Sequence, residues 1–255
     1  MAWEWIALGY LTYLAVVAAI GPGFSRARGP TSVAAFVGWV LWAMGSGAAR
    51  PVLVDTLAPA LVLVIGYWLS GLFFVRPMSA LEQRLLRADA ALARVCAIPC
   101  PWLLREYLEL AYVLVYVVVP TGALTLALGG HVSEVPRFWA VVLVTDFICF
   151  GFLPWVQTRP PRALEAGEPW SASARTLNLR ILGSTSITVN TFPSGHAAEA
   201  LAAALLTMDA PAPIVALMFA GAAAVSAGAV LGRYHYFADA LSGWIVALAV
   251  WVWLW

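Results

Sequence analysis

The stretch ADALSGWIVALAVWVWLW, residues 238–255, contains a single charged side chain, Asp239. A helix of this length rises about 27 Å at about 1.5 Å per residue, close to the thickness of about 30 Å of a bilayer's hydrocarbon core. The stretch therefore predicts a helix that crosses a membrane and carries an acidic residue near one end.

The whole chain has the same character. Of its 255 residues, 63% are hydrophobic and 11% are charged, whereas a soluble domain is charged at about a quarter of its positions. Apolar runs long enough to span fall at 3–20, 31–47, 52–75, 102–128, 138–157, 193–209, 212–231 and 238–255. We predict an all-α, polytopic membrane helix bundle with about eight transmembrane helices. Residues 31–47 are the weakest of these, because Gly45, Gly47 and Arg50 crowd the end of the run.

We expect an N-terminal transmembrane hairpin over residues 1–50 and a single membrane domain over residues 51–255. Residues 76–97 are too polar to cross, and Ser79-x-x-Glu82 is a capping-box start, so an interfacial helix is predicted there. Its apolar face would hold Leu81, Leu85, Ala88, Leu92 and Val95, with Arg87, Asp89 and Arg94 turned away. A solvated connector helix fits equally well. The polar segment 158–192 predicts a long functional or disordered loop.

Charge and cysteine content limit the partners. The net charge of +1 gives no basic patch for nucleic acid. Every basic residue is Arg, and the planar guanidinium suits phosphate. Cys96, Cys100 and Cys149 lack zinc spacing and are interpreted as packing residues. Glu4 stands where a signal peptide has positive charge, which favours a retained anchor.

Three short elements hold most of the versatile chemistry of the C-terminal half. They are Arg159-Pro160-Pro161-Arg162, Pro193-Ser194-Gly195-His196, and the run from Gly232 to Asp239. All lie at helix ends, and the number of spans between them places them on the same membrane face. They are predicted to form one site.

The second element resembles an anion cradle. Pro193 fits the first turn of a helix, where backbone N–H groups lack partners and the dipole is positive. Gly195 would let an anion approach and the Ser194 hydroxyl would add a donor. Arg159, Arg162 and Arg233 are candidates to clamp phosphate oxygens.

The third element supplies a nucleophile. His235 and Asp239 are four residues apart and share a helix face, so Asp239 can orient the ring of His235. With His196 opposite as the acid, phosphoryl transfer through a phosphohistidine is predicted. No metal and no cofactor are required.

Other ionisable residues receive plainer interpretations. His131 is expected to be a structural residue of its loop. Asp55, Asp146 and Glu199, in or near spans, fit helix packing and a proton path equally well.

The motifs RP, PSGH and His-x-x-x-Asp resemble the signature of the type 2 phosphatidic acid phosphatase superfamily, which includes the vanadium haloperoxidases. The family's Lys falls on Phe152 and its distal Arg on Ala229, so both are missing here. In these departures the chain is similar to the inositol phosphorylceramide synthase branch. Arg162 and the stretch from Glu109 to Tyr112 add to that similarity. The resemblance covers roughly residues 100–245.

The resemblance implies a six-helix phosphatase core behind the hairpin. It makes His235 the nucleophile, Asp239 its orienting partner, His196 the general acid, and Ser194, Gly195 and Arg159 phosphate ligands. Arg162 and Arg233 are candidates to replace the missing Lys and Arg. Which of Arg159 and Arg162 binds phosphate more closely is left open.

The main prediction is an integral membrane lipid-phosphate phosphatase, with membrane lipids and a lipid phosphate as partners. A phospholipid headgroup phosphotransferase is the alternative. A non-catalytic transporter or binding protein fits the residues less well, as does a haloperoxidase.

Two arguments disagree about which side of the membrane the site faces. Of the Arg residues, only Arg50 and Arg137 would lie opposite the site, which places the site in the cytoplasm by the positive-inside rule. The resemblance implies an extracytoplasmic site in a bacterial inner or plasma membrane. Because several of these Arg residues would bind phosphate, we follow the resemblance.

Overall fold

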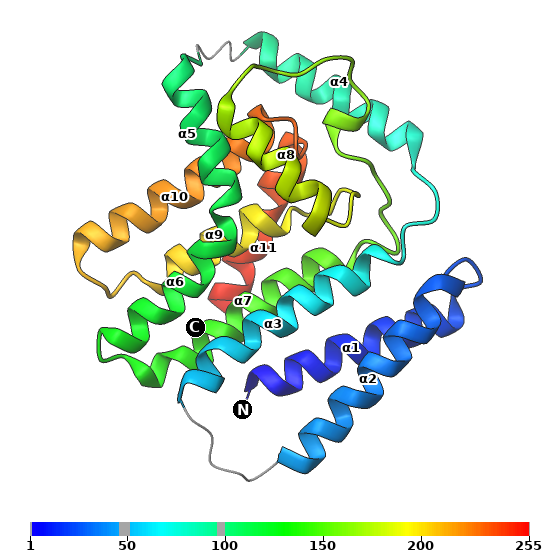
Figure 1. The fold of residues 1–255 in the computed structure, drawn as a ribbon, viewed down its shortest axis with the longest axis vertical. Helices are drawn as coiled ribbons and strands as arrows, with labels where there is room; N and C mark the ends of the chain where they lie inside the picture. The colour runs from blue at the N-terminus through cyan, green and yellow to red at the C-terminus, as the bar shows by residue number, and fades with distance from the viewer. Residues whose placement is uncertain (1, 46–51, 96–99, 255) are drawn as a thin grey trace.

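The computed structural model describes residues 2–45, 52–95 and 100–254. Within these ranges every regular secondary-structure element is a helix (Figure 1), which confirms the predicted all-α bundle. The helices are α1 (Ala2–Ile20), α2 (Ser25–Gly45), α3 (Val52–Gly71), α4 (Ser79–Val95), α5 (Trp102–Val113), α6 (Val115–Leu128), α7 (Val135–Gly151), α8 (Ser173–Thr185), α9 (Gly195–Leu206), α10 (Ala212–Leu231) and α11 (Phe237–Leu254). Short 3-10 turns occupy Val132–Glu134 and Pro161–Ala163.

Each of the eight apolar runs contains helix among its described residues, but the helices differ in length. By length and hydropathy, four of the described helices can cross a membrane, namely α1, α3, α10 and α11, and α5 with α6 makes a fifth that is bent by 63°. Helix α9 has 12 residues and rises about 18 Å, too short to cross alone. Among the described helices, therefore, fewer than the expected eight are full-length spans.

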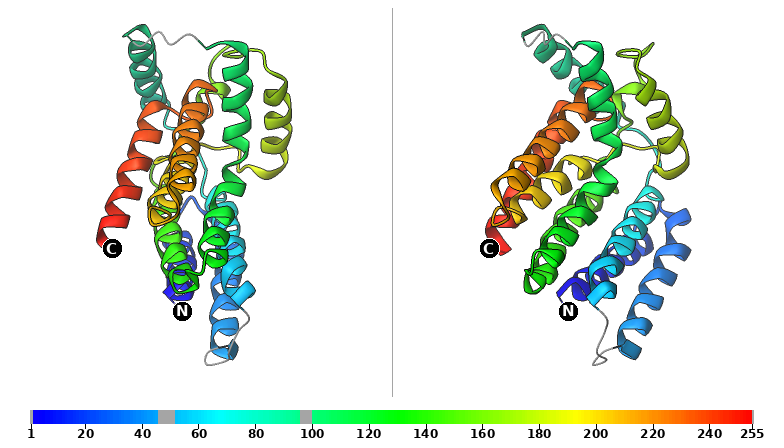
Figure 2. Two further views of the ribbon diagram at one scale, coloured as in Figure 1. Left: turned by 90° about the vertical axis from the view of Figure 1, so that its left-hand side faces the viewer. Right: turned by 60° about the vertical axis from the view of Figure 1, so that its left-hand side comes forward.

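The N-terminal hairpin consists of α1 and α2, which run side by side in both further views (Figure 2). Helix α2 begins at Ser25, earlier than the expected residue 31. The proposed domain boundary at residues 50 and 51, together with Gly47 and Arg50, lies outside the described residues, as do Cys96 and the end of the predicted segment 76–97.

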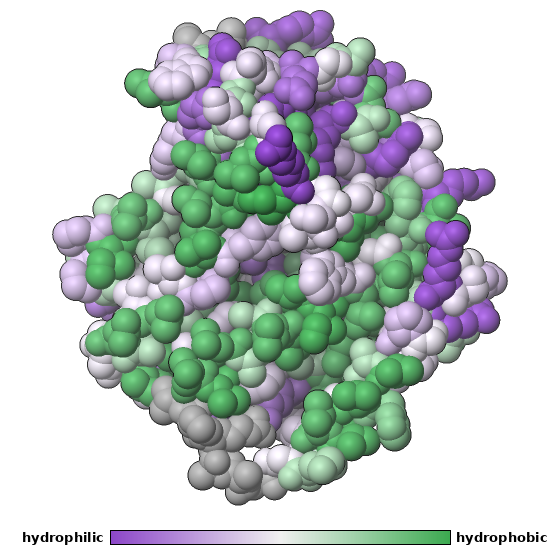
Figure 3. All heavy atoms as spheres, in the orientation of Figure 1, coloured by the Kyte–Doolittle hydropathy of each residue, from purple (hydrophilic) through white to green (hydrophobic). Residues whose placement is uncertain are grey.

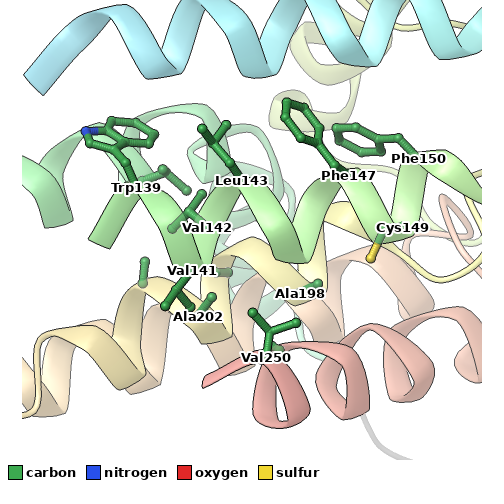
Figure 4. Packing of buried hydrophobic residues seen from close by; sticks show 14 of the residues in the cluster. Trp139, Val141, Val142, Leu143, Phe147, Cys149, Phe150, Ala198, Ala202 and Val250 are labelled. Atoms are coloured by element: carbon green, nitrogen blue, oxygen red, sulfur yellow. The ribbon is translucent and has the colours of Figure 1, made fainter. Parts of the chain in front are cut away.

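Helix α7 forms the centre of the core. Trp139, Leu143 and Phe147 point toward α3, while Val141 points toward α9 (Figure 4). The indole N–H of Trp139 donates to the carbonyl of Thr56 at 3.0 Å, so a buried polar group is satisfied between α7 and α3. Because α7 contacts both sides of the bundle, it fixes α9 relative to the N-terminal helices.

The alanines of α9 allow its neighbours to approach closely. Six of them are fully buried, since α6, α7, α10 and α11 surround the helix. They are Ala197, Ala198, Ala200, Ala202, Ala203 and Ala204. Small residues permit such close helix packing in an apolar medium. The apolar composition of residues 193–209 predicted a membrane span. In the structure it reflects a helix enclosed by other helices.

The outer surface is apolar over the middle of the molecule. Helix α11 exposes Leu241, Ile245, Leu248 and Val252 on one stripe. Figure 3 shows hydrophobic side chains across the middle and hydrophilic ones gathered at the end where α4 and α8 lie. A stripe of this kind facing outward fits lipid rather than water.

Gly243 should be sensitive to substitution. A Cβ at this position of α11 would lie 2.5 Å from the carbonyl oxygen of Ser194, whereas Gly221 on α10 has nothing within 4 Å. We expect Gly243→Ala to lower the free energy of unfolding by about 1–3 kcal/mol through overpacking. Thermal unfolding of both variants in lipid vesicles tests this. An equal effect of Gly221→Ala would contradict it.

Candidate active site

One small pocket is lined by residues from the predicted site. It lies between the start of α9 and the segment that joins α10 to α11, and has a volume of about 20 Å³. Its lining includes Arg162, Gly195, His196 and His235. Residues from all three sequence elements therefore meet at one place, while the chemical role of each residue remains a prediction.

Asp239 anchors the His235 side of the pocket. It lies in the first turn of α11, fully buried, and its Oδ2 accepts hydrogen bonds from Asn190 Nδ2 and the Tyr236 backbone N–H, both at 2.9 Å. These two donors satisfy that oxygen of the buried carboxylate. His235 Nδ1 lies 3.4 Å from the same oxygen, a long contact of the kind that tightens when a ligand binds.

Burial sets the protonation of His235. Its side chain is 7% exposed, and desolvation lowers its pKa below the usual value, although Asp239 opposes the shift. Because burial disfavours the imidazolium, His235 is neutral at neutral pH. A neutral imidazole has the free nitrogen that a nucleophile needs.

His196 faces His235 across the pocket. The two ring centroids are 6.1 Å apart and the rings are nearly perpendicular. Tyr112 and Tyr116 hold the His196 ring with edge contacts at 5.3 Å each. Its Nδ1 lies 3.0 Å from Glu199 Oε1, one turn further along α9.

The start of α9 differs in detail from the predicted cradle. Ser194 is the N-cap, and its Oγ accepts from the Ala197 N–H at 3.4 Å. Its own N–H donates to the Asp239 carbonyl at 2.9 Å. Pro193 precedes the cap and does not occupy the first turn. The amides that remain for an anion are those of Gly195 and His196, which begin the helix.

Gly195 has a packing role that the sequence did not reveal. A Cβ there would lie 2.5 Å from the ring of Phe150 on α7. The predicted reason for this glycine was the approach of an anion. The structure shows that the close packing of α7 already requires it.

Arg159 is bound by a carboxylate instead of lining the pocket. Its Nε and Nη2 donate to Glu82 at 3.0 and 2.8 Å, and its backbone N–H donates to the same side chain. The Glu82 side chain is 2% exposed, and these hydrogen bonds lower its pKa. Glu82 was predicted to close a capping box on α4, but it binds Arg159. The structure therefore does not bring the Arg159 side chain to the histidines.

Arg233 is likewise occupied by acidic groups. Its guanidinium pairs with Asp89 at 2.8 Å and with Glu165. Its backbone adopts φ 62, a left-handed conformation that is unusual for a residue with a Cβ. Asp89 also accepts from the Phe237 N–H at the start of α11. Arg233 thus joins α4 and the 158–172 segment to the α10–α11 connection.

Arg162 is the one of the three candidate arginines that lines the pocket. Its backbone N–H donates to the Arg233 carbonyl at 3.0 Å, and its guanidinium carbon lies 5.0 Å from the centroid of the Tyr234 ring. Within the described chain Arg162 forms no ion pair. Of the three candidate arginines, it has a charge that is not already neutralised and is near both histidines.

The buried face of α4 differs from the predicted one. The helix begins at Ser79 as expected, but the residues buried against the protein include Glu82, Leu85 and Asp89. Asp89 was predicted to lie away from the packed face, and Ala88, predicted to lie on it, is exposed. The two acidic residues, seven positions apart, instead attach α4 to the rim of the site.

A buried polar network supports the pocket from behind. Arg175 on α8 donates to Glu109 on α5 at 2.9 Å, and Tyr234 donates to Glu109 at 2.6 Å. Tyr234 also stacks on Tyr112 with centroids 4.2 Å apart. Helix α8 falls within the predicted polar loop 158–192. The spacing of Leu179 and Leu182, three residues apart and packed on the same core cluster, was the signal that could have revealed it.

A second, larger cavity lies at the other end of α9. It has a volume of about 770 Å³, and His131, Glu134, Arg137 and Asp209 contribute its polar lining. It contains none of the candidate catalytic residues. Among the described residues, no group of three or more His, Cys, Asp or Glu side chains could hold a metal ion.

Comparison with known proteins supports the resemblance at the superfamily level. Residues 135–255 match the model of the PAP2 superfamily. This range begins at α7 and includes all eight candidate site residues. No curated protein and no solved structure matches the chain. At the position of the superfamily's missing distal Arg, Ala229 is buried against Tyr112, Leu182 and Tyr234.

Loss of Arg175 should destabilise the protein. Arg175→Ala would leave Glu109 as a buried charge without its partner, which costs about 3–5 kcal/mol. Arg180→Ala, on the exposed side of the same helix, should change the free energy of unfolding by about 0.5 kcal/mol or less. Thermal unfolding in lipid vesicles compares them. Equal melting temperatures for the two variants would show that the network does not support the fold.

Proposed function

We propose that the chain is an integral membrane lipid-phosphate phosphatase that acts through a phosphohistidine. One observation carries the proposal: two histidines with rings 6.1 Å apart share a pocket with an unneutralised arginine, and each histidine has its own carboxylate. The match of residues 135–255 to the PAP2 superfamily supports a phosphatase-type reaction.

The first step transfers the phosphoryl group to His235. Asp239 orients Nδ1, so Nε2 attacks phosphorus and the N–P bond forms. The bond between phosphorus and the lipid oxygen breaks, and His196 donates a proton to that leaving oxygen. Arg162 and the amides of Gly195 and His196 are placed to bind the phosphoryl oxygens.

The second step releases phosphate. Water attacks phosphorus while His196, now neutral, accepts a proton from it, and the N–P bond to His235 breaks. The hydroxyl groups of Ser186 and Thr191 line the pocket and can hold the attacking water. The ligand-free pocket has a volume of about 20 Å³, which is smaller than a phosphate group, so substrate binding must open it. The match to the PAP2 superfamily favours hydrolysis over transfer to a second lipid.

The pocket is at the hydrophilic end of the bundle, beside α4, where a lipid headgroup can reach it. We place this end on the extracytoplasmic face, as the superfamily resemblance implies. The substrate is then a phosphate monoester or pyrophosphate carried by a membrane lipid.

His235→Ala should abolish turnover. The purified protein in lipid vesicles is supplied with phosphatidic acid, a lipid pyrophosphate and a phospholipid headgroup donor together with a lipid alcohol as acceptor, and free phosphate and lipid products are measured. Wild type should release phosphate and the variant should not, because the N–P bond cannot form. A new phospholipid without free phosphate would indicate the inositol phosphorylceramide synthase-like transfer reaction. No turnover of any substrate would contradict both.

Arg162 and Arg159 should differ in effect. Arg162→Ala removes the unpaired charge at the pocket, and kcat/KM should fall about 100-fold or more with the fold retained. Arg159→Ala leaves Glu82 buried without its partner, so the melting temperature should fall more than kcat/KM does. Kinetics and thermal unfolding of both variants separate these effects. A folded Arg159→Ala protein without activity would show that Arg159 leaves Glu82 to bind phosphate.

A further inference from the structure

Asp89 on α4 contacts the segment that carries His235 at two points. Its Oδ2 accepts from Arg233 Nη1 at 2.8 Å, and its Oδ1 accepts from the Phe237 backbone N–H at 3.1 Å. These two partners stand two positions before and two positions after His235. The Asp89 side chain is 6% exposed, so both contacts are shielded from water. One buried carboxylate thus holds the chain on either side of the proposed nucleophile.

Arg233 has a backbone that needs to be held. Its φ of 62° is left-handed, a conformation that a residue with a Cβ keeps only where its surroundings impose it. Glu165 binds the same guanidinium from the segment that follows Arg162. Of these two carboxylates, Asp89 is the one that also binds the first residue of α11. Asp89 therefore fixes the position of Arg233 relative to the start of that helix.

The backbone of Arg233 also reaches the arginine of the pocket. Its carbonyl accepts from the Arg162 N–H at 3.0 Å, and the direction of a carbonyl follows from the two backbone dihedrals of the chain. Two groups that the proposed reaction uses therefore depend on one residue. His235 follows Arg233 by two positions, and Arg162 is attached to it by a hydrogen bond.

We infer that Asp89 is the positioning residue of His235, and that α4 belongs to the catalytic unit although it precedes the matched residues 135–255. Asp89 acts through Arg233 and Phe237. The inference rests on the proposed function, in which His235 Nε2 attacks phosphorus. A displacement of about 1 Å in a reacting group can slow a reaction about 100-fold. The two contacts should therefore affect the rate of phosphoryl transfer more than the binding of substrate.

The segment has other restraints that keep it folded without Asp89. The backbone N–H groups of Tyr234 and His235 both donate to the Ala229 carbonyl at 2.9 Å, which joins the segment to the last turns of α10. These bonds hold the segment from the side of the core, whereas Asp89 holds it from the side of α4. We expect the loss of Asp89 to move the His235 ring without unfolding the segment.

The kinetic test compares two acids on the buried face of α4. Asp89→Asn can still accept from the Phe237 N–H but cannot pair with Arg233, and kcat should fall about 10-fold or more while KM changes less than about threefold. Asp89→Ala removes both contacts, and kcat should fall about 100-fold. Assays are run below the lowest melting temperature of the variants.

Glu82→Gln is the matched control for Asp89→Asn. It is the same change from carboxylate to amide, seven residues earlier on the same helix, in an acid that also pairs with an arginine. It should lower the melting temperature as Asp89→Asn does but leave kcat close to that of wild type. Equal losses of kcat in the two variants would overturn the inference, because attachment of α4 would then matter and the placement of His235 would not.

The ring signals of His235 give a readout that does not depend on turnover. The chain has 3 His residues, so the signals of ¹⁵N-histidine-labelled protein in lipid vesicles can be assigned by single His→Ala variants. At one fixed pH, Asp89→Asn should move the His235 signals and leave those of His131, while Glu82→Gln should leave both. This result is expected even if the protein releases no phosphate, which would contradict the proposed function alone.

Unchanged His235 signals in Asp89→Asn, or the same change in Glu82→Gln, would overturn the inference. Asp89→Glu displaces the carboxylate along a longer side chain. It replaces Asp89→Asn if that variant does not fold, and it should move the His235 signals as well.

Discussion

Charge buried in an apolar bundle must be neutralised by a neighbour, because little water is there to solvate it. The site is arranged around this constraint. Glu82 and Asp89 bring α4 to Arg159 and Arg233, and Glu109 binds Arg175 behind the pocket. Once these acids are paired with arginines, Arg162 and the two histidines are left facing the same small space. The carboxylates therefore determine which cations remain available to a ligand.

Much of the fold could be predicted because membrane helices are recognisable from long runs of apolar residues. Each apolar run contains helix, and the Ser79-x-x-Glu82 pattern marked the start of α4 although Glu82 pairs with Arg159. Position at helix ends was sufficient to predict that Arg162, His196 and His235 come together. These predictions used hydropathy, turn residues and a count of two spans between the second and third elements. The chain does return to the site through α9 and α10, although α9 is too short to be a full span.

Side-chain partners could not be predicted in the same way. The sequence offered three arginines for phosphate, and nothing in their spacing showed that Glu82 and Asp89 would occupy two of them. These acids come from a helix 77 and 144 residues away in the chain from the two arginines. Helix α8 was missed because its polar composition is typical of a loop. Tertiary contacts, such as the hydrogen bond from Asn178 to Glu109, stabilise it as a helix. The sequence suggested that Gly195 makes room for an anion. In the structure the ring of Phe150 already excludes a side chain at this position.

The attachment of α4 has a practical consequence for handling the protein. The helix exposes Arg84, Arg87 and Arg94 on its outer side and is held to the rim of the site through Glu82 and Asp89. A preparation can lose these two contacts while the helices of the core stay folded, so helical content is a poor guide to whether the site is intact.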